Sequence, residues 1–232
     1  MSKISTGTGL LKCRFDRENK KIEIDFSGYD DRDGYCYRND ASILFFSANS
    51  YRSAFLCLGK ELENRFDNSK VKNIGHMILP YLFNFRHFVE LELKALYVTL
   101  TGESPQITHS LNELICNINN KLTNLDYCDI DKGQGIFFKS EKFFEDTKKE
   151  CLETVEKLKV LIAQYIEDEP AVEYYRYIFE NETVNKKKEL ILNNSIVSLD
   201  FNLTNSLFLS IRDLFDKLHK ELTKIVYVQF SF

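Results

Sequence analysis

The sequence is poor in the residues that interrupt helices, with only three prolines and nine glycines among 232 residues. This scarcity favours a mostly helical protein, because proline and glycine are the residues that most disfavour a helix interior. The sequence also lacks any run of about 18 apolar residues, so no membrane span is expected. Its first residues, MSKISTGTGLLK, contain no apolar segment of the kind found in signal peptides, so none is expected.

The usual patterns of metal and nucleotide sites are missing as well. The six cysteines are scattered, and neither a CxxC pair nor a Cys/His pair at metal-ligand spacing occurs, which argues against a zinc site. Such cysteines are typical of a reduced, cytoplasmic protein. Thr6-Gly7-Thr8-Gly9 does not have the spacing of a phosphate-binding loop, so no cofactor is expected. The net charge of −4 does not indicate nucleic-acid binding by the whole chain, but it permits a local basic patch.

Two short stretches have the composition of β-strands. Ile22, Ile24 and Phe26 alternate with acidic residues, which predicts a β-hairpin formed by Leu11–Phe15 and Lys21–Phe26. This hairpin makes residues 1–38 a small β decoration in front of a helical domain over residues 39–232. Near the C-terminal third, the aromatic and β-branched run Glu173–Phe179 predicts a short β segment, with Ile196–Phe201 as a candidate partner.

The remaining apolar residues recur with helical spacing, and we predict a mainly α-helical bundle of four or five helices. Asp40 or Ser42 is the candidate cap of the first helix, Ser110 with Glu113 forms a candidate capping box, and Asn202 or Thr204 is the candidate cap of the last helix. The predicted helices span these residues: Asp40–Phe66, a helix from Val71 that either continues through or breaks before Pro80, Tyr81–Leu100, a helix from about Ile107, Ser140–Glu169 and Asn202–Ile225.

The helix over Tyr81–Leu100 has an unusual distribution of charge. Arg86, Glu90 and Lys94 are spaced four residues apart and therefore form one ladder along its side, with His87 next to it. Almost every other face of this helix is apolar, which predicts a central, buried helix. Because buried charges must be paired and hydrogen-bonded, these residues either pair with one another or line a cleft.

The first candidate site combines this ladder with residues predicted nearby: Arg86, His87, Glu90, Lys94, His109 and Arg176. His87 or His109 is suited to move a proton near neutral pH, and Arg86 or Lys94 is suited to stabilise the negative charge of a pentavalent phosphate. Together they have the chemistry of a metal-free nuclease. The alternative is a structural salt-bridge ladder in which Glu90 holds both Arg86 and Lys94.

The second candidate site is on the last predicted helix. Arg212 and His219 are seven residues apart, which is two helical turns, so they share one face. An acidic residue, Asp213, follows the arginine directly. The alternative is an ordinary exposed helix face, because an arginine and a histidine at this spacing often occur by chance.

Three segments of the sequence resemble a group of bacterial HEPN-like proteins. They are Phe85–Leu96, which contains an RHxxELxLK-type pattern, Thr108–Leu111, and Tyr175-Arg176-Tyr177. The resemblance covers roughly residues 40–225, and its most specific part is the ELxLK pattern. It implies an α-helical bundle, often dimeric, in a superfamily rich in RNA-cleaving toxins and antiviral effectors.

Active members of that superfamily cut RNA without a metal, commonly across a dimer interface, with an arginine and a histidine separated by four to six residues. Arg212 and His219 match this pattern, whereas no histidine follows Arg86 at the expected distance. The resemblance therefore implies an endoribonuclease that uses Arg212 and His219, with Arg176 and Lys94 contacting RNA. The partners it implies are RNA, a second copy of the chain, and a cognate antitoxin or defence-system protein. The alternative is a non-catalytic helical module that binds a protein partner or a nucleotide.

Overall fold

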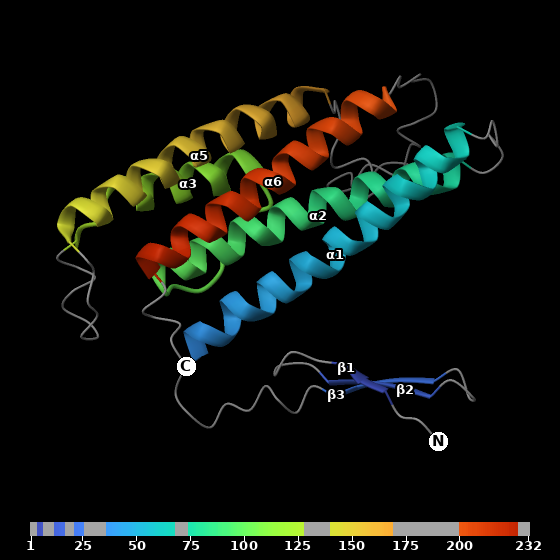
Figure 1. Ribbon diagram of the computed structural model, residues 1–232, viewed down its shortest axis with the longest axis horizontal. Helices are drawn as coiled ribbons and strands as arrows, with labels where there is room; N and C mark the ends of the chain where they lie inside the picture. Colours follow the sequence, from blue (N-terminus) through green and yellow to red (C-terminus); the bar gives the residue numbers. More distant parts are fainter. Residues whose placement is uncertain are drawn as a thin grey trace, which may run out of the picture.

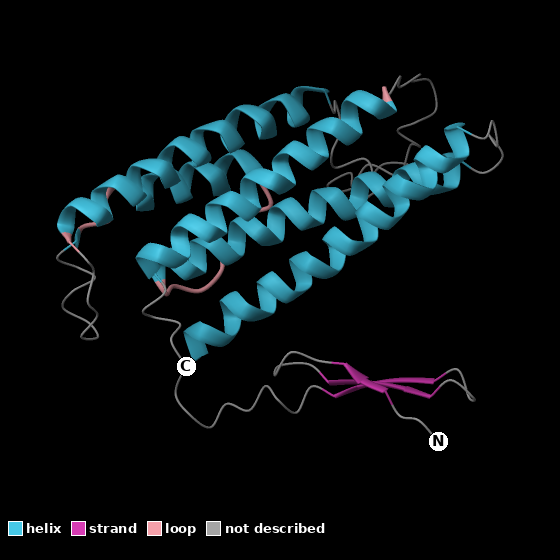
Figure 2. Cartoon of the chain, viewed as in Figure 1, coloured by secondary structure: helices cyan, strands magenta, loops and turns pink. Residues whose placement is uncertain are grey.

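The computed structural model describes residues 4–6, 12–16, 21–25, 36–67, 74–127, 140–168 and 200–226. The described residues contain five helices that form a bundle, which confirms the prediction of a mainly helical protein (Figures 1 and 2). The helices are α1 (Cys36–Asp67), α2 (Ile74–Thr101), α3 (Leu111–Thr123), α5 (Glu141–Asp168) and α6 (Phe201–Val226).

Three short strands precede the bundle in the chain. They are β1 (Ile4–Thr6), β2 (Lys12–Asp16) and β3 (Lys21–Asp25), and they form an antiparallel sheet in the order β1-β2-β3. Ile4 is opposite Phe15 in the first pair of strands, and Phe15 is opposite Ile22 in the second. The sheet is drawn in magenta in Figure 2. The first helix then begins at Cys36, ahead of both predicted caps, Asp40 and Ser42.

Helix α2 lies at the centre of the bundle, where it contacts α1, α3 and α6. The prediction of a central, buried helix is therefore confirmed. Its aromatic side chains build the core with those of α1 and α6: the ring of Phe85 stacks on Phe208 with centroids 3.4 Å apart, and Phe55 packs edge-on against Phe85. Fully burying one such phenylalanine stabilises the fold by about 1.5–3 kcal/mol.

Helix α2 runs through Pro80 without a break, which settles the choice that the sequence left open. Pro80 is the seventh residue of this helix rather than part of a first turn, so the helix lacks the hydrogen bond that its missing N–H would have made. Helix α2 ends at Thr101, one residue beyond the predicted Leu100. Gly102 takes a positive φ of 67° and donates its backbone N–H to the carbonyl of Val98, the arrangement that glycine favours after a helix.

The helix starts follow local hydrogen bonds that only partly match the predictions. Ser110 caps α3, as predicted, by accepting from the N–H of Glu113 at 3.3 Å, and the helix itself begins at Leu111. The carboxylate of Glu113 accepts from the hydroxyl of Thr108. For α6 both predicted caps are wrong. Asp200 accepts from the N–H of Leu203 at 3.0 Å, because a carboxylate placed one residue before the helix reaches that N–H.

Several predictions fall on residues outside those that the structure describes. They include the β segment at 173–179 and most of its candidate partner at 196–201. Phe201, the last residue of that candidate partner, is the first residue of α6. Among the described helices, none combines the length and the apolar composition that a membrane span requires.

Candidate functional site

Glu90, on the central helix, is the meeting point of three basic side chains. Its carboxylate accepts from Lys94 Nζ at 2.9 Å and from Arg86 Nη1 at 3.3 Å, so the three residues of the predicted ladder are joined by two ion pairs. The ring nitrogen Nδ1 of His109 lies 2.8 Å from the same carboxylate. Glu90 itself is only 5% exposed. The structure therefore brings together four of the six residues of the first candidate site.

The charge of Glu90 is stabilised by these partners. Burial alone raises the pKa of its carboxyl group, because it disfavours the charged form. The hydrogen bonds from Lys94 and His109, with the positive charge of Arg86, outweigh this effect and lower the pKa below its ordinary value. A carboxylate held in this state is a fixed negative charge, which suits a structural centre better than a proton carrier.

The same cluster fixes the loop between α2 and α3. Arg86 donates a second hydrogen bond, from Nη2 to the backbone carbonyl of His109 at 2.5 Å. His109 is the residue just before the N-cap Ser110, so both its ring and its backbone are tied to α2. The loop and the start of α3 are thereby anchored to the central helix through charged side chains.

His87 does not join the cluster. Its ring packs against two aromatic rings instead, with centroids 5.0 Å from Tyr51 on α1 and 4.4 Å from Phe83 on its own helix. His87 follows Arg86 directly, and consecutive residues of a helix point about 100° apart around its axis. Arg86 therefore faces Glu90, whereas His87 faces α1. Arg176, the sixth residue of the first candidate site, lies outside the described residues.

A second charged cluster lies between α2 and α6. His219 Nε2 is 2.6 Å from a carboxylate oxygen of Glu92, and its ring packs edge-on against Phe45 of α1 with centroids 4.5 Å apart. Glu92 is buried, with 3% of its side chain exposed, whereas 30% of the His219 side chain reaches solvent. The histidine is thus held at one nitrogen by a buried carboxylate while part of its ring faces outward.

Two arginines form ion pairs with aspartates of the helix that carries this histidine, and only one of them, Arg212, was predicted. Arg212 is bonded to its neighbour Asp213 through Nε at 2.8 Å and Nη2 at 2.5 Å. Arg52 of α1 forms a two-pronged pair with Asp216, at 2.6 and 2.7 Å. The bond from Asp216 raises the pKa of the Arg52 guanidinium against the opposing effect of burial, and the charges of Glu92 and Asp213 add to the increase.

These contacts place Arg52 close to three acidic residues of the cluster and in the same region as Arg212 and His219. Within the described residues, Arg212 makes no hydrogen bond or ion pair with His219. Arg52 and Asp216 were missed from the sequence because they are 164 residues apart. A signal for Glu92 existed: it is an acidic residue on a helix whose other faces are apolar.

The two clusters lie on different sides of the central helix. Glu90 and Glu92 are two residues apart, which corresponds to a rotation of about 200° around the helix axis. His109 is therefore bound to one side of α2 and His219 to another, and they do not share a site. Any chemistry that needs a histidine next to an arginine must use one cluster alone.

Across the part of the chain that the structure describes, no group of three or more histidine, cysteine, aspartate or glutamate side chains is arranged to hold a metal ion. Comparison of the chain with models of known protein families, with curated proteins and with solved structures gave no significant match.

Proposed function

We propose that this protein is a HEPN-like, metal-independent endoribonuclease and that its site is the cluster of α1, α2 and α6 around His219. The observation that carries the proposal is the pair of His219 with the buried Glu92, because it orients a partly exposed imidazole on the helix that also presents Arg212. A carboxylate bonded to one nitrogen of a histidine fixes the ring and leaves the other nitrogen for proton transfer.

In the proposed reaction, His219 removes the proton from a ribose 2′-hydroxyl of bound RNA. The 2′-oxygen then forms a bond to the adjacent phosphorus while the bond from phosphorus to the 5′-oxygen breaks. The leaving 5′-oxygen takes a proton from water, and the protonated His219 returns its proton to the solvent, so the products are a 2′,3′-cyclic phosphate and a 5′-hydroxyl. Arg212 and Arg52 supply guanidinium groups to stabilise the negative charge of the pentavalent phosphate.

The first candidate site has a different part in this proposal. Glu90 already accepts from Arg86, Lys94 and His109, so these donors are engaged in holding α2 and α3 together. We assign them a structural role that supports the fold around the site. The RNA contacts of Arg176 and Lys94 and the antitoxin or defence-system partner remain predictions from the resemblance. The cytoplasmic location remains a prediction from the scattered cysteines.

A second candidate function is a non-catalytic binding module. One observation favours it: the two arginines beside His219 are each already paired with an aspartate. Two arginines opposite Glu92, Asp213 and Asp216 leave the cluster without excess positive charge, whereas RNA binding depends on cations that neutralise phosphates. In this reading the charged clusters only hold the helices in place, and the molecule acts through its surface.

RNA cleavage by four purified proteins separates the two functions. The wild type, His219→Ala and Arg212→Ala are incubated with cellular RNA in the presence of EDTA, together with His76→Ala, which replaces an exposed histidine of α2 outside both clusters. We expect the wild type and His76→Ala to cleave RNA equally, and the other two variants to lose about 100-fold or more of the rate. Equal cleavage by all four proteins, or none by the wild type, would refute the proposal.

A further inference from the structure

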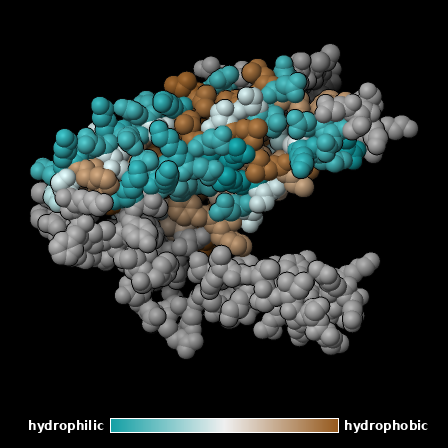
Figure 3. Space-filling view, in the orientation of Figure 1, coloured by the Kyte–Doolittle hydropathy of each residue, from teal (hydrophilic) through white to brown (hydrophobic). Residues whose placement is uncertain are grey.

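Helices α5 and α6 pack side by side and enclose a groove on the surface of the bundle. Its volume is about 1130 Å³, and its apolar lining consists of four aliphatic side chains, Leu152, Val160, Leu161 and Leu214. Val160 lies in the middle of a long helix and is nevertheless 65% exposed. Figure 3 shows hydrophobic surface between hydrophilic rows on the side of the bundle where α5 and α6 lie. Covering this groove with another apolar surface is therefore favourable.

The rims of the groove carry charges of both signs, and some of them are already paired. Asp213 accepts from Arg212, while Glu156 accepts from Asn119 and lies 3.8 Å from Lys159. Within the described residues, the other charged side chains of the rims form no ion pair, namely Lys149, Lys157, Lys217 and Glu153. The rims thus offer a partner three ammonium groups against one carboxylate.

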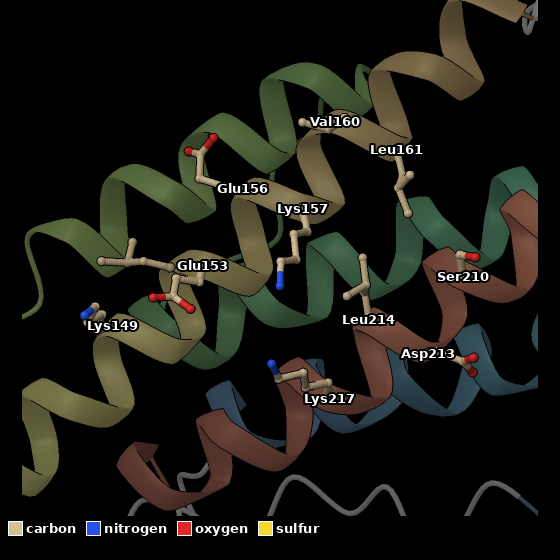
Figure 4. A pocket seen from close by; sticks show the side chains of 11 residues that line it. Lys149, Glu153, Glu156, Lys157, Val160, Leu161, Ser210, Asp213, Leu214 and Lys217 are labelled. Carbon is tan, nitrogen blue, oxygen red and sulfur yellow. The ribbon is translucent and has the colours of Figure 1, made fainter.

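Two of these lysines reach into the middle of the groove. Figure 4 shows Lys157 of α5 and Lys217 of α6 extending toward each other from opposite rims, with Leu214 beside them. Two ammonium groups in this position repel each other, so an anion between them is favoured. Lys149 is eight residues before Lys157 on α5, which is two helical turns or roughly 12 Å. The groove therefore presents positive charge at two points along its length and aliphatic side chains around them.

This combination selects among the possible occupants of the groove. A second copy of the same surface would bring an excess of lysines against an identical excess, and such like-charge contacts are unfavourable. A nucleic acid would neutralise the lysines, but bases bind to proteins by stacking on aromatic rings, and none of the described residues that line the groove is aromatic. A helix with one apolar face and acidic residues beside that face fits both the aliphatic lining and the lysines.

We propose that the groove between α5 and α6 binds an acidic amphipathic helix of a partner protein. From Lys149 to Leu161 the groove follows α5 for about 18 Å, which accommodates about three turns of the partner helix. The apolar side chains of that helix, three or four residues apart, cover the four aliphatic side chains of the groove. Its carboxylates pair with Lys149 at one point and with Lys157 and Lys217 at the other. The inference depends neither on RNA cleavage nor on the resemblance to HEPN-like proteins.

A designed peptide measures this binding directly. The probe is a fluorescent helical peptide of about 15 residues with leucines on one face and glutamates on both flanks, and its counterpart has lysine in place of each glutamate. Fluorescence anisotropy with the full-length protein should show micromolar binding of the glutamate peptide, because so short an interface lies at the weak end of specific interfaces. High salt should weaken this binding, and the lysine peptide should bind about tenfold or more weakly.

Charge reversal in the protein locates the binding site. Lys157→Glu/Lys217→Glu should bind the glutamate peptide about tenfold or more weakly than the wild type does, and it should bind the lysine peptide more tightly. The control Lys60→Glu/Lys142→Glu makes the same change of charge at two exposed lysines outside the groove. It should leave both affinities unchanged.

The apolar lining is tested separately. Val160→Asp should bind the glutamate peptide about tenfold or more weakly, because it replaces an apolar contact with a like charge. Its circular dichroism should stay helical, since the side chain is already exposed. Leu203→Asp is the control, because it changes an exposed leucine of α6 outside the groove and should leave the binding unchanged.

Three results of these measurements overturn the proposal. They are no binding of the glutamate peptide below about 1 mM, equal binding of both peptides by the wild type, and unchanged binding by Lys157→Glu/Lys217→Glu. A 2′-O-methyl RNA oligonucleotide, which lacks the free 2′-hydroxyl that cleavage requires, tests the other anionic occupant. If the lysine substitutions abolish binding of this RNA but not of the peptide, the groove is an RNA surface and the proposal is wrong. It is also wrong if they change only the self-association of the protein in sedimentation equilibrium, because the occupant is then a second copy.

Discussion

Replacing Glu90 by leucine removes the carboxylate on which three donors converge, and the structure allows the cost to be estimated. The change leaves Lys94 and Arg86 with 11% and 17% of their side chains exposed and without their carboxylate. Breaking a buried ion pair from one side costs about 3–5 kcal/mol, because the remaining charge is left uncompensated. Since Arg86 keeps its bond to the carbonyl of His109, we expect the lower end, about 3 kcal/mol.

The same reasoning predicts that a second change repairs part of this loss. Lys94→Met in the Glu90→Leu background removes the stranded ammonium group and replaces it with an apolar side chain of similar length. The double variant should therefore be more stable than Glu90→Leu alone by about 1 kcal/mol or more. In the wild-type background Lys94→Met should instead lower the stability, because it removes a hydrogen-bond donor to Glu90.

Urea unfolding followed by circular dichroism measures these free energies, and thermal unfolding should show a fall of about 6–12 °C for Glu90→Leu. Glu61→Leu is the control, because Glu61 forms an ion pair four residues along a helix with Arg65 but is about half exposed. Its loss should cost less than about 0.5 kcal/mol. If Glu90→Leu costs no more than this control, or if Lys94→Met destabilises both backgrounds equally, the Glu90 cluster does not stabilise the fold as argued.

Two more predictions concern pH and packing. Because the pKa of Glu90 is lower in the folded protein than its ordinary value of 4.5, the stabilisation it gives is complete above about pH 4.5 and is lost as the pH falls further. When the free energies of unfolding of the wild type and Glu90→Leu are measured between pH 3 and 7, their difference should therefore become smaller only below about pH 4.5. Gly59→Leu should destabilise the protein by about 1–3 kcal/mol in urea unfolding, since even a Cβ at Gly59 would lie 3.0 Å from the ring of Tyr81.

Local patterns were sufficient for the features that depend on neighbours in sequence. The four-residue spacing of Arg86, Glu90 and Lys94 predicted a ladder along one side of the helix and offered its ion pairs as one of two alternatives, and both ion pairs are present. The scarcity of proline and glycine predicted the helical bundle. The start of α6 was misplaced because Asp200, which caps it, precedes the residues with helical periodicity. Local propensity could not decide whether the helix continues through Pro80. The hydrogen bond lost at proline opposes a continuous helix and the packing of the whole helix favours it, and the helix is continuous.

The His219 cluster was beyond prediction for a different reason. Its two decisive contacts, His219 with Glu92 and Arg52 with Asp216, join residues 127 and 164 positions apart. No periodicity relates such residues, because their distance depends on how three helices pack. The spacing of Arg212 and His219 indicated this region of α6 as a candidate, but it gave no sign that Arg212 and Arg52 would each already hold an aspartate.

The two carboxylates of the central helix explain why chemistry is assigned to one cluster and stability to the other. Glu90 accepts from a lysine, an arginine and a histidine, so its charge is fixed and a proton has little access to it. The side-chain partner described for Glu92 is an imidazole, the side chain that most often serves as a general acid or base. A change at Glu90 should therefore reduce stability first, whereas a change at His219 should reduce activity in a protein that remains folded. Measuring both properties on both variants distinguishes a catalytic histidine from a structural one, because a purely structural His219 would lose both together.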